Sequence, residues 1–454
     1  MPHKPIPAPV LTGRSIGNVK AHNLRAVLLT LLHNGPTARV HLAQLTGLST
    51  TTITNLIGEL LAQGIVSEAG REIPGEGREV NGRAGGGRTG GGRSNSGRPA
   101  TLIRIIPAAR CAVGIHFGVD MLRAGVTDLF GNLTCYRVQP HSVDAPVPEL
   151  LETAVALAEE VIAAGCVSRE SLVGIGVGAS GLVDPETGVN VLAPNLGWRD
   201  VPLRDVFQRQ LDMPVIVDNN VRAMALAEGM FGAGRGVNTL AFVYGRVGVG
   251  AGFVVGGQVY RGSKAGAGEI GHTTAIQAGG APCRCGNTGC LETLVSEPEI
   301  VRQAQVLAAR APGSILAARL NAPQAVDQPA VDQPAANMDG NPDSPIERVF
   351  AAARDGDREA LALLGERAGY MGTALANLVN LINPDMIILG GLFAAGQDLL
   401  LPGIEETMRR RSFAGLGEAV ALRVTTFGRQ VGVIGAAALA LDAFFYRQDA
   451  LPAA

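Results

Sequence analysis

The stretch GEIGHTTAIQAGGAPCRCGNTGCLET, residues Gly268–Thr293, brings one histidine and three cysteines close together in the chain. Ten residues separate His272 from Cys283, one separates Cys283 from Cys285, and four separate Cys285 from Cys290. Three thiolates and one imidazole make a closed tetrahedral set of soft ligands, which favours Zn²⁺ over Mg²⁺ or Ca²⁺. Because such a set leaves no open coordination position, we expect a structural zinc ion. Inert thiols or a redox pair are the alternative.

The composition indicates a soluble protein, and the other cysteines indicate a reducing compartment. The chain has 454 residues, 46% apolar and 17% charged, which is enough for two or three domains with apolar cores. Cys111, Cys135 and Cys166 stand alone in apolar surroundings, so we expect buried thiols. The start, MPHKPIPAPV, lacks the apolar region of a signal peptide, and Asp442 interrupts the most apolar segment, VGVIGAAALALDAFF. We therefore expect a cytoplasmic protein without a membrane span.

Residues 1–70 have the pattern of a small helical domain. Helical patterns between residues 23 and 64 are separated by turns at Gly35 and Gly47, and a strand follows. This order is typical of a winged helix-turn-helix, whose third helix enters the major groove of DNA. Ser49 is the expected N-cap of that helix. The residues expected to contact DNA there are Ser49, Thr50, Thr51, Thr52 and Asn55. A helical bundle with a structural role is the alternative.

The charge distribution favours a polyanionic partner for this head. Lys and Arg outnumber Asp and Glu by eleven to five through Arg98, whereas the remainder has 27 against 35. Residues 71–100 form a Gly/Arg-rich wing extension and linker, in which arginines recur every five residues from Arg83 to Arg98. Gly97-Arg98-Pro99 resembles the core of a minor-groove hook, so Arg98 is a further DNA-binding candidate. A low-complexity linker is the alternative.

From Thr101 onward, strand patterns alternate with helical patterns. Two sets of strands, each opening with a Gly-rich hairpin, predict a duplicated α/β fold with a cleft between two lobes. We place the lobes at residues 101–233 and 234–430, and expect the C-terminal helix within 431–454 to pack back on the first lobe. The repeat AVDQPAVDQPAA, within residues 322–345, predicts a disordered surface insertion.

Together these motifs resemble the ROK family of sugar kinases and repressors. The resemblance covers nearly the whole chain except residues 71–98 and 322–345. Its carriers are GEIGH, CRCGNTGCLE, GIGVGASGLVDPETG, APNLGW, NLINPDMIILGG and the winged-helix pattern followed by GRPA. The resemblance implies an α/β actin-like ATPase fold of the ribonuclease H-like type, with two lobes and a sugar in the cleft. It also implies a homodimer or tetramer.

The resemblance also implies a set of sugar-binding residues. They are Asn195, Asn219, Asn220, Glu269, His272 and Glu292. Carboxylates and carboxamides are suited to the paired hydroxyl groups of a sugar. A cap or turn residue is the alternative for any one of them taken alone.

Three parts of the kinase machinery of this family are altered here. Family kinases place an Asp, the general base, where this chain has Asn220, and a carboxamide does not accept the proton. The first phosphate hairpin, Asp-x-Gly-Gly-Thr in the kinases, is His116–Asp120 here. The second, Gly-Thr-Gly, is Arg246-Val247-Gly248. We expect Asp120 to repel a phosphate, and we therefore expect no catalytic residue and no kinase activity.

These observations predict a sugar-responsive DNA-binding transcriptional regulator, a repressor of carbohydrate-utilisation genes with a degenerate sugar kinase domain. The expected partners are a palindromic operator in double-stranded DNA, a sugar or sugar phosphate effector, and a second copy of the chain, with no membrane. A bifunctional ROK sugar kinase that phosphorylates a hexose is the alternative. A sugar-binding scaffold whose head contacts protein is a third possibility.

Overall fold

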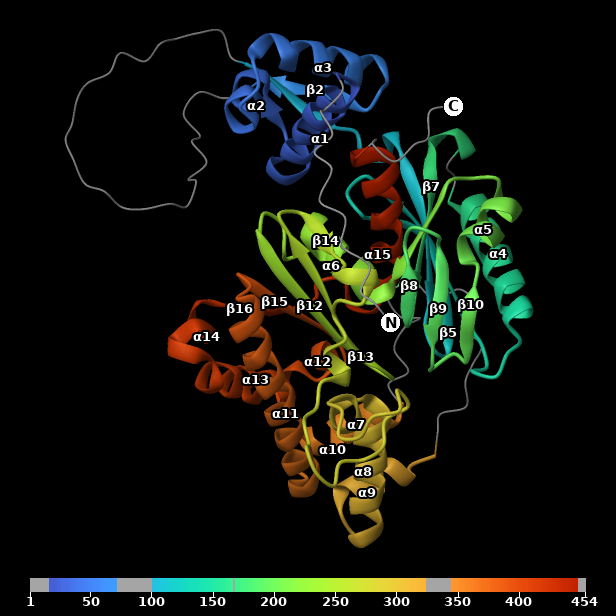
Figure 1. Ribbon diagram of the computed structural model, residues 1–454, viewed down its shortest axis with the longest axis vertical. Coiled ribbons are helices and arrows are strands. Elements are labelled where there is room, and N and C mark those ends of the chain that lie inside the picture. Colours follow the sequence, from blue (N-terminus) through green and yellow to red (C-terminus); the bar gives the residue numbers. More distant parts are fainter. Residues whose placement is uncertain (1–15, 72–99, 166–167, 324–343, 448–454) are drawn as a thin grey trace, which may run out of the picture. The chain divides into compact units, whose positions relative to one another are not determined.

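The computed structural model describes residues 16–71, 100–165, 168–323 and 344–447 (Figure 1). The chain divides after Ala109 into an N-terminal unit, to which the last residues from Ala443 also belong, and a second unit, Arg110–Asp442. The Gly/Arg segment with Arg98, most of the expected insertion and Cys166 lie outside the described residues.

The N-terminal unit contains the three helices and the following strand in the expected order, and a short strand between the first two helices that was not expected. The helices are α1 (Ile16–Asn34), α2 (Arg39–Thr46) and α3 (Thr50–Ala62), and the strands are β1 (Thr37–Ala38), β2 (Val66–Arg71) and β3 (Thr101–Ile105). Gly47 follows α2 with φ 69°, a left-handed conformation that glycine adopts without strain. Ser49 is the N-cap of α3, because its side chain accepts a hydrogen bond from the Thr52 backbone N–H at 3.1 Å.

The strand β3 belongs to this unit, whereas we expected the first lobe to begin at Thr101. The three strands form an antiparallel sheet in the order β1-β3-β2, in which Val66 pairs with Ile105. Ile103 and Ile105 are buried while Arg104 between them is exposed, the period-two pattern of a strand with one face on a core. The boundary therefore lies after Ala109.

The second unit contains two five-stranded sheets with the same topology. In each sheet an antiparallel meander of strands is followed by two parallel strands, giving the orders β11-β7-β4-β5-β6 and β16-β15-β12-β13-β14. The first sheet contains β4 (Cys111–Phe117), β5 (Met121–Asp128), β6 (Leu133–Pro140), β7 (Leu172–Ala179) and β11 (Val215–Asn219). The second contains β12 (Thr239–Gly245), β13 (Val249–Val255), β14 (Gln258–Tyr260), β15 (Met386–Gly391) and β16 (Ala421–Val424). This repetition is the duplicated fold expected from the two Gly-rich hairpins.

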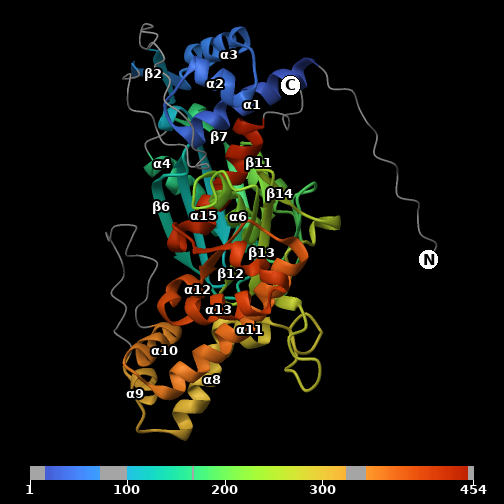
Figure 2. The same cartoon turned by 90° about the vertical axis from the view of Figure 1, so that its left-hand side faces the viewer.

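Helices cover both faces of each sheet (Figures 1 and 2). The outer face of the first sheet carries α4 (Val147–Ala164), and α5 (Leu203–Leu211) contacts α4 and β11. Two helices that contact each other lie between the sheets, α6 (Asn220–Met230) and α15 (Val431–Ala440). The second sheet shares its core with α8 (Glu297–Arg310), α10 (Pro345–Arg354), α11 (Arg358–Ile382) and α13 (Gln397–Arg411). The remaining short elements are α7 (Glu292–Val295), α9 (Ile315–Asn321), α12 (Leu392–Ala395), α14 (Leu416–Ala419) and the small sheet β8 (Leu182–Asp184), β9 (Val189–Ala193) and β10 (Trp198–Val201).

The helix α15 packs closely on β4 and β7 because glycines face it. A Cβ atom on Gly176 would lie 1.7 Å from the carbonyl oxygen of Ala436, and one on Gly114 would lie 2.2 Å from that of Val433.

Among the described residues, one helical stretch, Gly428–Tyr446, is long and apolar enough to cross a membrane. Its most apolar window is 78% buried inside the protein, as in the core helix of a globular domain.

Candidate functional site

A cleft of about 130 Å³ opens within the second unit, between the two sheets and the loop that follows β14. Side chains from both lobes line its wall. All six residues expected to bind sugar are among them, namely Asn195, Asn219, Asn220, Glu269, His272 and Glu292. The fold thus brings together residues that are up to 97 positions apart in the sequence.

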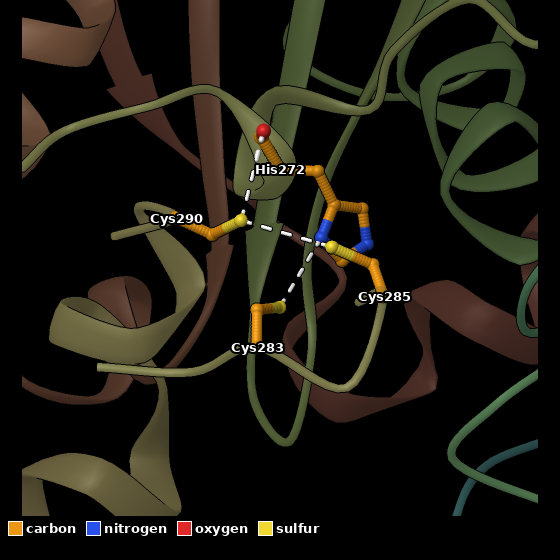
Figure 3. Close-up of side chains that lie close together, drawn as sticks. All are labelled: His272, Cys283, Cys285 and Cys290. Carbon is orange, nitrogen blue, oxygen red and sulfur yellow. Dashed lines mark hydrogen bonds between the residues drawn. The ribbon is translucent and has the colours of Figure 1, made fainter. Parts of the chain in front are cut away.

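The expected metal ligands lie at one edge of this cleft. The ligand atoms of His272, Cys283, Cys285 and Cys290 all lie within 4.8 Å of one another (Figure 3). His272 Nδ1 is 3.6 Å from Cys283 Sγ, and Cys285 Sγ is 3.7 Å from Cys290 Sγ. In a tetrahedron with Zn–S bonds of about 2.3 Å, neighbouring sulfurs are separated by about 3.8 Å. The cluster therefore has the donor set and the size of a structural zinc site.

Burial keeps two of the three thiols protonated when no ion is present, so metal binding would release their protons. Burial raises the pKa of Cys290 to about 12, and burial also raises the pKa of Cys283. Both groups would be neutral thiols at pH 7 without a positive ion beside them. A zinc ion would be held by the four residues as thiolates and imidazole, and would fix the loop between His272 and Cys290.

His272 was expected in both the metal set and the sugar set, and its two ring nitrogens have separate environments. Nδ1 lies on the side of Cys283. Nε2 lies 3.9 Å from Glu269 Oε2, and both residues line the cleft. One nitrogen can therefore bind metal while the other contacts a ligand, with the ring orientation fixed by the metal.

Asn195 and Glu292 approach each other from opposite lobes at Gly248. A Cβ atom on Gly248 would lie 3.2 Å from Glu292 Oε2 and 3.3 Å from Asn195 Nδ2. Glu292 also accepts a hydrogen bond from the Val249 backbone N–H at 2.9 Å, which anchors its carboxylate beside the second hairpin. The missing side chain of Gly248 leaves the space that these two polar groups share.

Arg284 is a cleft residue that sequence reasoning missed. It stands between the ligands Cys283 and Cys285, lines the cleft, and donates a hydrogen bond from Nη1 to Asn195 Oδ1 at 3.0 Å. Its position inside the metal motif was the available signal, because a loop fixed by a metal can hold a long side chain over a neighbouring cleft. The contact couples the metal loop to the lobe that carries Asn195.

The trio Asp218-Asn219-Asn220 has three different environments. Asp218 is fully buried, and its carboxylate binds Arg222 Nε at 2.7 Å and Arg261 Nε at 2.9 Å. Asn219 caps α6, since its side-chain oxygen accepts from the backbone N–H groups of Val221 and Arg222. Asn220 is the first residue of α6 and donates to Ser180 Oγ at 3.3 Å. Only Asn219 and Asn220 line the cleft.

A sequence profile described as the ROK family matches residues 112–443, most of the chain and all of the cleft residues. The chain belongs to the ROK family. The xylose repressor of Caldicellulosiruptor bescii is 29% identical over 424 residues, which cover 93% of this chain and 96% of that protein.

Two solved ROK structures have the same fold. A ROK family transcriptional regulator, described as a homologue of the Escherichia coli Mlc protein, has a TM-score of 0.73 and 25% identity, covering 95% of this chain and 98% of its own. A ROK family glucokinase from Streptomyces griseus, in complex with glucose and AMPPNP, has a TM-score of 0.61 and 29% identity. It covers 73% of this chain and 99% of its own. The second unit therefore has the actin-like sugar kinase fold of the ROK family.

The hairpin after β4 and the hairpin after β12, which we expected to correspond to the phosphate hairpins of ROK kinases, are joined by an ion pair. Arg246 Nη1 and Nη2 donate to the two carboxylate oxygens of Asp120 at 2.5 and 2.7 Å. Burial opposes ionisation of Asp120, but the hydrogen bonds and charge of Arg246 outweigh it and lower the pKa of Asp120. We expected Asp120 to repel a phosphate; its carboxylate also neutralises the arginine of the opposite hairpin.

The expected DNA contacts lie together at the start of α3. Ser49, Thr50, Thr51 and Asn55 are exposed, and Thr52 is partly buried beside Ser49. The buried face of the same helix carries Ile53, Leu56, Ile57 and Leu60. The polar residues therefore occupy the solvent face of the helix at its N-terminal end. Arg98, the remaining candidate, lies outside the described residues.

Proposed function

We propose that this protein is a sugar-responsive, DNA-binding transcriptional repressor of carbohydrate-utilisation genes, whose kinase-like domain binds a sugar without phosphorylating it. One observation carries the proposal. All six residues expected to bind sugar line the cleft, and the Asp120–Arg246 pair joins the hairpins after β4 and β12, while the family resemblance implies that Asn220 stands where the kinases have their base. The relatives also support a regulator rather than a kinase. A xylose repressor and a ROK family transcriptional regulator match nearly the whole chain, whereas the glucokinase matches 73% of it.

The cleft offers the groups that a sugar requires. Carboxylates accept hydrogen bonds from sugar hydroxyl groups, and carboxamides both donate and accept. Glu269 and Glu292 supply the carboxylates, and Asn195 and Asn220 supply amides. Arg284 would adjust its hydrogen bond to Asn195 when a sugar enters. Zinc bound at the adjacent cluster would hold His272 and the loop in place.

Phosphoryl transfer by the mechanism of the family kinases would lack its base at the position of Asn220. Asn220 cannot accept the proton of a sugar hydroxyl group. The nearest carboxylate in the sequence, Asp218, is fully buried and already engaged by Arg222 and Arg261. Moving it to the cleft would leave two arginines without their counterion, at a cost typical of breaking a buried ion pair, about 3–5 kcal/mol.

The structure of the N-terminal unit supports the proposal that the protein binds DNA. Its helices, sheet and exposed α3 face have the layout of a winged helix-turn-helix, in which α3 would enter the major groove. A homodimer or tetramer in the cytoplasm would present two such helices to a palindromic operator. Sugar binding would close the cleft and alter the spacing of the two heads, which requires a coupling of about 1–3 kcal/mol between the sites.

The alternative function is a bifunctional sugar kinase with a DNA-binding head, and the likeness to the glucokinase favours it. Both functions are tested by incubating the full-length protein with ATP, Mg²⁺ and a panel of hexoses and pentoses. Our proposal predicts no sugar phosphate above the rate of an Asn220→Ala control. Product formation that this variant abolishes would establish the kinase.

DNA binding is tested with duplexes selected from a genomic fragment library at physiological salt. Thr51→Ala and Asn55→Ala should weaken retention of the selected duplex by about tenfold, because each removes a polar contact at the groove. Gln63→Ala, an exposed change at the far end of α3, is the matched control and should bind normally. Equal binding by all variants would refute the assignment of α3 to the major groove.

A further inference from the structure

The imidazole of His116 is buried at the end of β4 without a hydrogen-bond partner among the described residues. Its exposed fraction is 5%, and neither Nδ1 nor Nε2 has a partner. A buried polar group without a partner destabilises a protein, so such a group calls for an explanation. His116 also lines the cleft, and a small rearrangement of the cleft wall when a ligand binds would uncover its ring nitrogens.

The packing around His116 keeps the ring at the cleft. A Cβ atom on Gly432, at the start of α15, would lie 2.7 Å from the ring, so the helix backbone covers one side of it. In the sheet, His116 pairs with Gly178 of β7. A Cβ atom on Gly178 would lie 3.7 Å from the Cβ of Asn220. His116 and Asn220 therefore flank Gly178 and line the same end of the cleft.

Two arginines and two carboxylates lie near this end of the cleft. Arg246 is paired with Asp120, and Glu297 lies 4.0 Å from its Nε atom. Arg123, the strand partner of His116, adds a second buried positive charge. Burial, together with the charges of Arg123 and Arg246, lowers the pKa of His116 to about 3, so the ring is neutral at pH 7.

A neutral imidazole has one N–H donor and one acceptor nitrogen, which matches a hydroxyl group. A phosphate group, by contrast, would gain one donor from the ring and would meet the carboxylate of Asp120. It would also have to displace that carboxylate from Arg246 to form an ion pair. The wall is thus suited to an uncharged polar group.

We propose that His116, together with Asn220, hydrogen-bonds the sugar hydroxyl group that a kinase of this fold would phosphorylate. The effector is then an unphosphorylated sugar that carries a hydroxyl group at that position. This assignment rests on the proposed function, because it requires a sugar in the cleft. It makes His116 a specificity-determining residue.

The test is isothermal titration calorimetry of the full-length, zinc-loaded protein with D-glucose, 6-deoxy-D-glucose, D-glucose 6-phosphate and D-xylose. The wild type should bind D-glucose at least tenfold more tightly than each of the other three compounds. His116→Phe keeps a ring of similar size against Gly432 but has no nitrogen. It should bind D-glucose and 6-deoxy-D-glucose with affinities that agree within about threefold.

The outcomes separate the two proposals. If the wild type binds 6-deoxy-D-glucose, D-xylose or D-glucose 6-phosphate as tightly as D-glucose, the role of His116 is refuted while the sugar site stands. The same conclusion follows if His116→Phe keeps the wild-type preference for D-glucose. If neither these four compounds nor a panel of other unphosphorylated hexoses and pentoses binds, both the role of His116 and the proposed sugar site are refuted. If His116→Phe does not fold, the comparison of the four compounds on the wild type still decides, and His116→Leu, which also has no polar atom, replaces the variant.

Discussion

Asp120 and Arg246 form a two-pronged ion pair, with N···O distances of 2.5 and 2.7 Å, between the hairpin that follows β4 and the hairpin that follows β12. By the family resemblance, Asp120 stands where the kinase pattern has Thr, and Arg246 stands where it has Gly. Together they neutralise each other and connect the two lobes. The pair is therefore a contact within the protein that links the two hairpins.

The coupling between these two side chains can be measured in a double-mutant cycle. Asp120→Asn and Arg246→Gln should each lower the free energy of unfolding, and the double variant should lose less than the sum. Because the Asp120 side chain is 45% exposed, we expect a coupling of about 1 kcal/mol from urea denaturation. Additive effects would show that the pair contributes nothing to stability.

Gly248→Ala should block sugar binding while leaving the fold intact. The added methyl group would lie 3.2 Å from Glu292 Oε2 and 3.3 Å from Asn195 Nδ2, so it would push apart two groups that face the ligand. We expect calorimetry to show at least a tenfold loss of sugar affinity, with a melting temperature within about 2 °C of the wild type. Gly313→Ala, in the exposed turn between α8 and α9 with open space around it and outside the cleft lining, tests the general effect of adding a methyl group. Normal sugar affinity in Gly248→Ala would exclude the arrangement described for Asn195 and Glu292.

Removal of the metal should weaken both stability and sugar binding. The four ligands lie in one loop, and that loop carries His272 and leads directly into Glu292 at the start of α7. We expect one zinc ion per chain by elemental analysis. Cys285→Ser should lose the metal, melt at a lower temperature and bind sugar more weakly. Cys111→Ser, a buried thiol in the first lobe, controls for the loss of a cysteine and should retain the metal. A metal content that is unchanged in Cys285→Ser would contradict the assignment.

The buried imidazole of His116 should make stability fall on acidification. The pKa of His116 is lowered from 6.5 to about 3 in the folded chain, chiefly by burial. Between these values the unfolded chain binds a proton that the folded chain does not, so the group lowers the free energy of unfolding by about 1.4 kcal/mol per pH unit below 6.5. Urea denaturation of His116→Phe between pH 6 and 4.5 should show a shallower fall than the wild type by this amount. An exposed histidine variant, His22→Ala, should follow the wild type. Parallel curves for His116→Phe and the wild type would show that the ring is not buried and neutral.

Parts of the site could be predicted from the sequence when the contacting residues lie close together in the chain. The spacing of His272, Cys283, Cys285 and Cys290 predicted a cluster because a short loop brings its own ligands together. The six cleft residues followed from the family motifs. The pair Asp120–Arg246 did not, because these residues lie 126 positions apart and join two separate lobes. The contact from Arg284 to Asn195 was missed for the same reason.

The domain boundary shows a different limit of sequence patterns. Thr101–Ile105 has the alternation of a strand, but the alternation does not specify the sheet to which the strand belongs. The partner strand β2 ends at Arg71, and pairing across residues 72–99 is not encoded in either segment. Similarly, the sequence placed Asp218 beside Asn220, but only the fold revealed that Arg222 and Arg261 hold its carboxylate.

The most direct test of the central claim is the affinity of the full-length protein for its selected operator duplex, measured by fluorescence anisotropy with and without a saturating sugar. The account predicts that the sugar changes the affinity by about 5- to 150-fold, and that Gly248→Ala abolishes this response. It also predicts the same change with and without ATP and Mg²⁺, because no phosphoryl transfer is involved. An operator affinity that a bound sugar leaves unchanged, or that changes only when ATP is present, would contradict the account.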